Sequence, residues 1–93
     1  MDEQFGIASF RSRQQVMHFE RALRRAGVPA SIITTPRSVS VGCGLSVRFE
    51  LRDLKDVQDV YQVAKPGNLI GFYRVERLDG RTQVRPMGVQ TGY

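Results

Sequence analysis

Two amphipathic helical patterns alternate with strand-like segments along this 93-residue chain, and their order leaves few possible folds. Val16, Phe19 and Leu23 recur at the spacing of one helical face. Leu45, Val47 and Phe49 instead alternate with polar residues, as in a half-buried strand. In chain order, we predict a strand at 5–10, a helix at 12–26, a strand at 30–35, a strand at 45–50, a helix at 53–64 and a strand at 69–76.

The first helix carries recognisable signals at both ends. Ser12, followed three residues later by Gln15, has the pattern of a capping box. Gly27 suits the residue that follows a helix, and Pro29 prevents the helix from continuing. In the second helix, Asp53 is the predicted N-cap.

The order of strands and helices is that of the split βαβ pattern, βαββαβ. We therefore predict an α+β, ferredoxin-like, two-layer sandwich, with two helices on one face of an antiparallel sheet of four strands. Asp79-Gly80 suits a two-residue turn, which predicts a C-terminal β-hairpin extension with a short fifth strand near 82–85. The whole chain, 1–93, is one predicted domain, with a core at about 5–77 and the hairpin extension and tail at 78–93.

The composition excludes several classes of function. A net charge of +5 favours acidic partners, and no apolar run is long enough for a membrane helix. The acidic start, Met1-Asp2-Glu3, is unlike a secretory signal, so we expect a cytoplasmic protein. One cysteine cannot supply an intramolecular disulfide framework or a multi-cysteine metal site, and one histidine leaves few candidate parts for a catalytic triad or a zinc site. We therefore expect no metal, no cofactor and no enzymatic activity, and the remaining candidate for covalent chemistry is Cys43.

The predicted topology places Cys43 beside the start of the first helix. A right-handed crossover brings the loop that carries Cys43 to the end of the sheet where that helix begins, together with the 65–68 connection. A helix N-terminus and nearby cations favour the thiolate, which is the nucleophilic form of cysteine. We expect the 37–44 loop to be exposed. The basic neighbours that the topology provides are Arg11, Arg13, Arg37 and Lys65. The alternative is a Cys43 that packs under the loop as a small apolar residue.

A loop of proline, arginine and serine leads to a Cys-Gly pair and then to the alternating strand. Its residues are Pro36, Arg37, Ser38, Ser40, Cys43 and Gly44, followed by Leu45-Ser46-Val47-Arg48-Phe49. This segment resembles the family of selenium/sulfur carrier-like proteins, which began as a domain of unknown function. The resemblance runs from Phe5 to about Arg77 and includes the Gly71–Arg74 strand. The hairpin and tail after Leu78 fall outside it, and the chain lacks the Cys-Pro-x-Pro motif of the better-known small sulfur-transfer proteins.

The resemblance implies a carrier that holds sulfur or selenium on Cys43 as a persulfide or selenosulfide. It implies a cysteine desulfurase, or another sulfur or selenium donor, and an acceptor protein as partners. Both cargoes stay open at this point, as do the acceptor and the oligomeric state. The loop residues that would support Cys43 are Pro36, Arg37, Ser38, Ser40, Gly42 and Gly44.

Two other classes of function fit the same predicted fold. An RNA-binding module would stack bases on the open face of the sheet. That face would present Ser46, Arg48 and Glu50, a poor platform whose carboxylate repels phosphate, so we do not expect a nucleic-acid partner. A regulatory domain that dimerises through an exposed sheet is the second alternative, and for it Cys43 would have no role.

Overall fold

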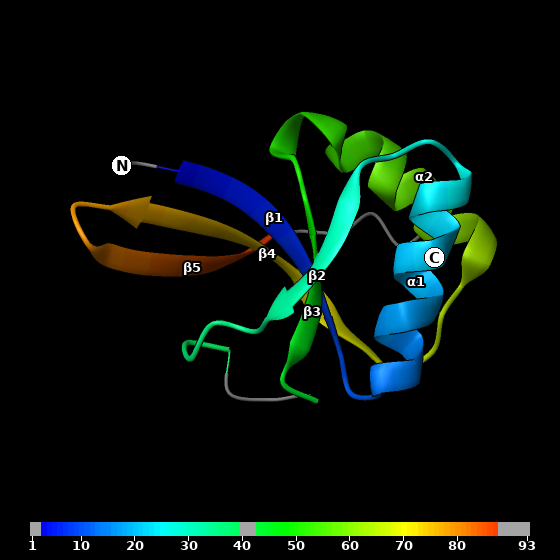
Figure 1. The fold of residues 1–93 in the computed structure, drawn as a ribbon, viewed down its shortest axis with the longest axis horizontal. Helices are drawn as coiled ribbons and strands as arrows, with labels where there is room; N and C mark the ends of the chain where they lie inside the picture. The colour runs from blue at the N-terminus through cyan, green and yellow to red at the C-terminus, as the bar shows by residue number, and fades with distance from the viewer. Residues whose placement is uncertain (1–2, 40–42, 88–93) are drawn as a thin grey trace.

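The structure, a computed structural model, describes residues 3–39 and 43–87, and these form a sheet covered by two helices (Figure 1). The elements are β1 (Glu3–Phe10), α1 (Arg13–Arg25), β2 (Ala30–Thr34), β3 (Leu45–Phe49), the short 3-10 helix η1 (Leu51–Asp53), α2 (Leu54–Ala64), β4 (Leu69–Leu78) and β5 (Arg81–Met87). No helix among these residues is long and apolar enough to cross a membrane.

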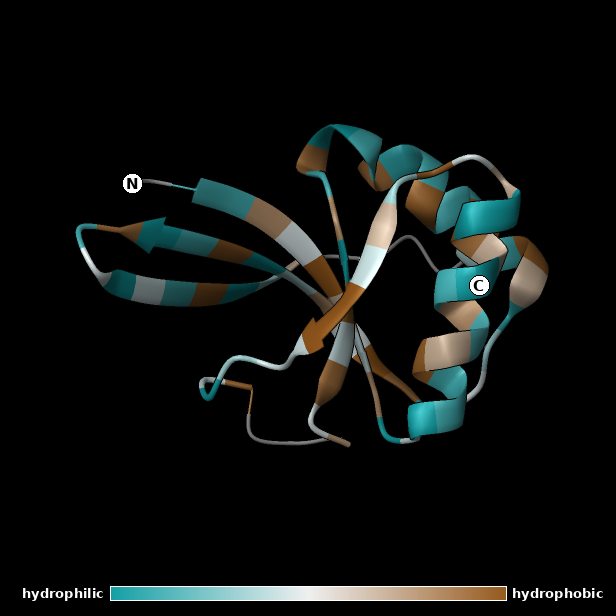
Figure 2. Ribbon diagram, viewed as in Figure 1, coloured by the Kyte–Doolittle hydropathy of each residue, from teal (hydrophilic) through white to brown (hydrophobic). Residues whose placement is uncertain are grey.

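The sheet has five strands in the order β2-β3-β1-β4-β5, and every neighbouring pair is antiparallel. The predicted α+β sandwich with two helices and an antiparallel sheet is confirmed. The four-stranded ferredoxin-like sheet is not: with β5 at the edge, the strand order is not that of the ferredoxin fold. Two apolar residues attach β5 to the sheet, one on each face: Val84 lies opposite Val75, and Met87 lies opposite Phe72. Figure 2 shows that the rest of β5 is mostly hydrophilic.

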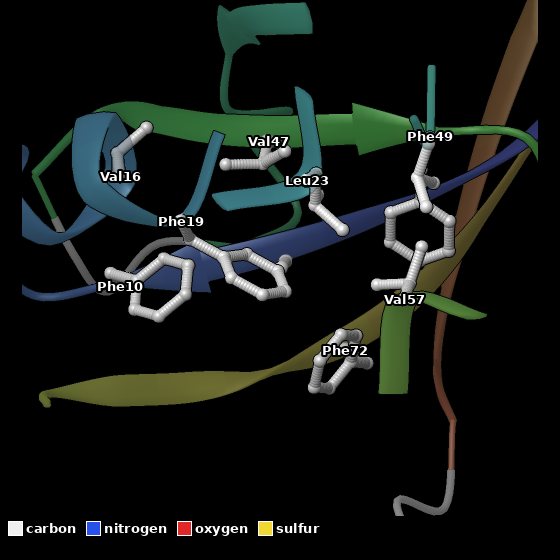
Figure 3. Close-up of a cluster of buried hydrophobic side chains, with 10 residues drawn as sticks. Phe10, Val16, Phe19, Leu23, Val47, Phe49, Val57 and Phe72 are labelled. Atoms are coloured by element: carbon white, nitrogen blue, oxygen red, sulfur yellow. The ribbon is translucent and has the colours of Figure 1, made fainter. Parts of the chain in front are cut away.

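The main core lies between the helices and the sheet, and aromatic rings fill much of it (Figure 3). The Phe19 ring of α1 makes edge-to-face contacts with Phe10 of β1 at 5.6 Å and with Phe72 of β4 at 6.4 Å between ring centroids. Phe49 of β3 contacts Phe72 in the same way at 6.1 Å. Such contacts stabilise a core beyond the burial of apolar area. The five phenylalanines of the chain are all buried, although Phe5 belongs to a second cluster.

Helix α1 begins and ends within one residue of its predicted bounds. Gly27 has a φ of 78°, the left-handed conformation that glycine adopts most readily after a helix. The capping box predicted at Ser12 is wrong, because its side chain makes no capping hydrogen bond. The N–H groups of Gln15 and Val16 instead donate to the Ser12 carbonyl, at 3.1 and 3.2 Å.

The sheet face opposite the helices carries a second, smaller apolar cluster of Phe5, Ile7 and Val75. The guanidinium of Arg48 lies 4.0 Å from the centroid of the Phe5 ring, and that of Arg77 lies 5.3 Å from it. A cation over a ring face is attracted to it, and the long arginine stems cover apolar surface. This face is therefore not the open, solvated surface that an RNA-binding module would need.

Candidate functional site

Backbone hydrogen bonds hold Cys43 beside the end of β1. The Cys43 N–H donates to the carbonyl of Phe10, the last residue of β1, at 3.3 Å. Helix α1 begins three residues after Phe10, at Arg13. The structure therefore places Cys43 at the start of α1, as the topology predicted.

The two ends of the cysteine loop are joined directly to each other. The Thr35 N–H donates to the Gly44 carbonyl at 2.9 Å, and the Thr35 and Ser46 hydroxyls are hydrogen-bonded at 2.6 Å. Ser46 also bonds the Ser9 hydroxyl of β1 at 2.8 Å, so one hydroxyl chain links β1, β3 and the loop. These contacts fix the base of the loop.

The residue after Cys43 explains why a Cys-Gly pair suits this position. Gly44 has a φ of 86°, in the left-handed region that side-chain-bearing residues rarely adopt. This conformation turns the chain into β3 while the Gly44 carbonyl still faces Thr35. A glycine is therefore required by the backbone geometry next to the cysteine.

The Cys43 side chain is half-buried and packs against the main core cluster. Its Sγ donates a weak hydrogen bond to the Leu45 carbonyl at 3.6 Å. Only a protonated thiol can make this bond, since a thiolate has no proton to donate. Cys43 therefore has a feature of each predicted alternative: it packs as an apolar residue, yet part of its side chain stays accessible.

The rest of the predicted supporting loop divides into described and undescribed residues. Ser40 and Gly42 lie outside the described residues. Pro36 begins a turn, closed by a hydrogen bond from the Val39 N–H to the Pro36 carbonyl at 3.0 Å. Arg37 and Ser38 are exposed at this turn. Val39 is half-buried against the second cluster, so the expected exposure of the loop is only partly correct.

The basic residues predicted near Cys43 lie at the same end of the molecule. Arg11, Arg13 and Lys65 are all exposed. The Arg11 N–H donates to the Asn68 carbonyl at 2.9 Å, which ties the connection after α2 to the end of β1. Within residues 3–39 and 43–87, none of these side chains forms a hydrogen bond with Sγ of Cys43. Their influence on the Cys43 thiol therefore stays a prediction.

Ser46 and its hydroxyl partners were missed as parts of the site. Ser46 was predicted to face solvent, and this prediction is wrong, because Ser46 is fully buried. The face opposite the helices is covered by Val39 and Ile33, so a small polar residue there needs an internal partner. The sequence signal for this buried hydrogen bond was Ser9, which places a hydroxyl within the otherwise apolar end of β1.

The described residues contain no group of three His, Cys, Asp or Glu side chains that could hold a metal ion. Cys43, the one cysteine of the chain, is a free and half-buried thiol. Residues 5–66 match the family described as "Putative Se/S carrier protein-like". The chain belongs to this family, and the match includes Cys43 and its loop but neither β4 nor β5. No curated protein and no solved structure matches the chain.

Proposed function

We propose that this protein carries sulfur or selenium on Cys43 and has no catalytic activity of its own. The observation that carries the proposal is the position of Cys43 within the family-matched segment, at a loop base held by Phe10 and Thr35. A carrier needs a thiol with a defined position that a partner can reach. It needs neither an oxyanion hole nor a general base, which agrees with a chain that has one cysteine and one histidine.

The proposed transfer conserves atoms and electrons at each step. The Cys43 thiolate attacks the terminal sulfur of a persulfide on the donor protein, and the donor's S–S bond breaks as a new S–S bond forms. The donor cysteine leaves as a thiolate, and Cys43 becomes a persulfide. A nucleophile on the acceptor then attacks the terminal sulfur, and Cys43 leaves as a thiolate. With selenium the intermediate is a selenosulfide, and the exchange is otherwise the same.

The conformation of Cys43 adds one requirement to this mechanism. Sγ lies 3.6 Å from the Leu45 carbonyl, and the side chain packs against the core. The side chain must leave this contact before it attacks, and the weak hydrogen bond of a thiol opposes that change only slightly.

The proposed donor is a cysteine desulfurase, and the acceptor is a further protein. The exposed Arg11, Arg13 and Lys65 would attract an acidic surface of either partner towards Cys43. A free, unpaired thiol suits the reducing cytoplasm, which is the proposed location.

Intact mass spectrometry tests the proposal directly. The protein is incubated with a cysteine desulfurase and cysteine, and its mass is read without reductant. We expect a gain of one sulfur atom, lost again when a reductant is added. Cys43→Ser is expected to show no gain.

A variant with its cysteine at another position tests whether sulfur loading depends on the surroundings of Cys43 or only on an accessible thiol. The control variant carries Cys43→Ser together with Ser38→Cys, which moves the thiol to the exposed turn of the same loop. We expect it to accept sulfur from the desulfurase much more slowly than the wild type. Equal loading of the two proteins, or no loading of the wild type, would contradict the proposal.

A further inference from the structure

A continuous groove runs between α1 and α2 on the outer surface of the helical layer. It consists of three adjoining hollows, the middle one of about 580 Å³. The first and middle hollows share His18, and the middle and last share Ala26, Asp59 and Val60. The groove therefore follows the whole length of the helix pair.

The chemistry of the groove changes along its length. The hollow nearest the Cys43 end includes Arg21 and Lys65 in its lining. The middle hollow is lined mainly by small apolar side chains, with His18, Arg25 and Asp59 at its margins; the apolar residues are Ala22, Ala26, Val60, Val63 and Ala64. The far hollow includes three carboxylates, which are Asp53, Asp56 and Asp59. The surface is thus basic at one end, apolar in the middle and acidic at the other end.

The apolar middle is unusually exposed. Val63 is 87% exposed, more than any other large hydrophobic residue in the described part of the chain, and Met17 of the neighbouring hollow is 44% exposed. Asp56, Asp59 and Val63 follow each other at helical spacings of three and four, so they share a face of α2 that is distinct from the buried Val57. Val63 therefore does not serve the core of its own chain, and apolar surface of this kind is typical of an interaction site.

The charged side chains at the two ends of the groove have few ion-pair partners among the described residues. Within residues 3–39 and 43–87, no ion pair involves Arg21 or Asp56. Asp59 pairs only with Lys55, at 3.2 Å and fully at the surface. Such an exposed ion pair contributes little to stability, so Asp59 can readily pair with a cation of another molecule instead.

We propose that the groove binds a second copy of this chain, forming a symmetric dimer through the helical layers. The two-fold axis passes through the apolar middle, lies in the plane of the interface and is perpendicular to the length of the groove. It places the two grooves face to face and running in opposite directions. The basic end of each copy then lies over the acidic end of its partner, and the two apolar middles cover each other. An interface of this kind is self-complementary, as two-fold symmetry requires. An acidic partner protein would match only one end of the groove, which is why a second copy is the better fit.

The dimer leaves both cysteines free. Cys43 lies at the N-terminal end of α1, a helix of 13 residues and about 20 Å. Because the two grooves run in opposite directions, the two Cys43 residues lie at opposite ends of the dimer. The dimer therefore does not depend on a disulfide between them, and it stands independently of the proposed carrier function.

Sedimentation equilibrium of the full-length protein with reductant tests the proposal. We expect the average mass of the wild type to rise from monomer to dimer with concentration. Val63→Glu puts a charge in the apolar middle without disturbing the core, and it should weaken dimerisation about tenfold or more. Arg21→Glu and Asp56→Arg should each weaken it to a similar degree, because like charges then face each other twice.

Mixing the two charge variants gives the decisive measurement. In a mixed dimer of Arg21→Glu with Asp56→Arg, both end contacts again join opposite charges, so we expect the mixture to dimerise more tightly than either variant alone. The matched control is Arg81→Glu, which makes the same charge change at the exposed first residue of β5, and this variant should dimerise as the wild type does. A monomeric wild type, unchanged variants or a mixture that stays monomeric would each overturn the proposal. A monomer that binds an acidic protein through the groove would show that the occupant is another molecule.

Discussion

Gly44 sets the backbone direction behind Cys43, and its φ of 86° is a conformation that costs other residues free energy. We predict that Gly44→Ala lowers the free energy of unfolding by about 1–3 kcal/mol. No heavy atom lies within 4 Å of the Cβ that alanine would add, so the cost comes from backbone strain and not from a clash. Urea denaturation measures the loss, and the alkylation rate of Cys43 should rise as the loop base loosens.

Gly44→Asn is the matched control for this prediction. Asparagine adopts the left-handed region more readily than alanine, so we expect a smaller loss of stability and an alkylation rate closer to that of the wild type. If alanine were as stable as glycine here, the left-handed conformation would not be what selects the glycine beside Cys43.

Ser46 links three segments through two short hydrogen bonds, to Ser9 and to Thr35. We predict that Ser46→Ala destabilises the protein by about 1–3 kcal/mol, because it leaves buried hydroxyls of the partners without their bond. The exposed Ser31 of β2 provides the comparison, and Ser31→Ala should change stability by less than about 0.5 kcal/mol. Thermal or urea unfolding of both variants decides the matter, and equal stabilities would show that the hydroxyl chain contributes nothing.

At the scale of residues, apolar periodicity could be read from the sequence but polar burial could not. Leu45, Val47 and Phe49 face the main core as predicted, since alternation identifies one buried face of a strand. Ser46 was misassigned because the alternation does not reveal that Val39 covers the opposite face. Whether a polar side chain is buried depends on partners distant in sequence, such as Ser9, which lies 37 residues from Ser46.

Among the elements, the pairing of β1 with β3 depends on close packing at Gly6. Gly6 lies directly opposite Phe49, and a Cβ at position 6 would clash with the Phe49 ring. Phe49 is fully packed in the core and cannot move aside cheaply. We therefore predict that Gly6→Ala destabilises the protein by about 1–3 kcal/mol, measured by urea denaturation.

Gly67→Ala is the control for the Gly6 substitution. Gly67 precedes β4 in an exposed connection, and nothing lies within 4 Å of the Cβ that alanine would add. We expect its stability to equal or slightly exceed that of the wild type, because alanine restricts the unfolded chain. A Gly67→Ala loss as large as that of Gly6→Ala would mean that the clash with Phe49 is not the cause.

The helices were easier to predict than the strand ends. Both helices match their predicted ranges within one residue, because each has a clear apolar face and a defined stop. β1 and β4 are longer than predicted, because the charged residues at their ends still pair with residues of the neighbouring strand. Glu3 lies opposite Arg77 in the register, and their side chains form an ion pair at 2.8 Å. A search for apolar alternation ends before such residues, although the sheet continues through them.

At the scale of the whole molecule, the fold has a helix-covered part and a projecting part. The molecule measures 37 × 25 × 24 Å, and the β4–β5 hairpin extends away from the helices (Figure 1). The family match ends at residue 66, before this hairpin begins. The cysteine loop depends on β1, β2 and β3, so β5 should matter for stability more than for the chemistry at Cys43.

Removing β5 by ending the chain after Leu78 tests this division. β5 pairs only with β4, and its half-buried Val84 and Met87 pack against the second and main clusters. Half-burial of two such side chains contributes about 2 kcal/mol to the free energy of unfolding. We therefore predict that urea denaturation shows a loss of that size, while the helical circular dichroism signal is retained. The truncation also bares the edge of β4, whose unpaired N–H and carbonyl groups should promote association.

The same truncation made in the Val63→Glu variant separates this association from any dimer through the helical layer. We expect sedimentation to show concentration-dependent association that the full-length Val63→Glu protein lacks, because the bared edge is a new surface. Sulfur loading of Cys43 should continue, since the bonds from Cys43 to Phe10 and from Thr35 to Gly44 do not involve β5. A truncated chain without helical signal would instead show that the hairpin is required for the fold, because β4 cannot remain in the sheet as an unprotected edge.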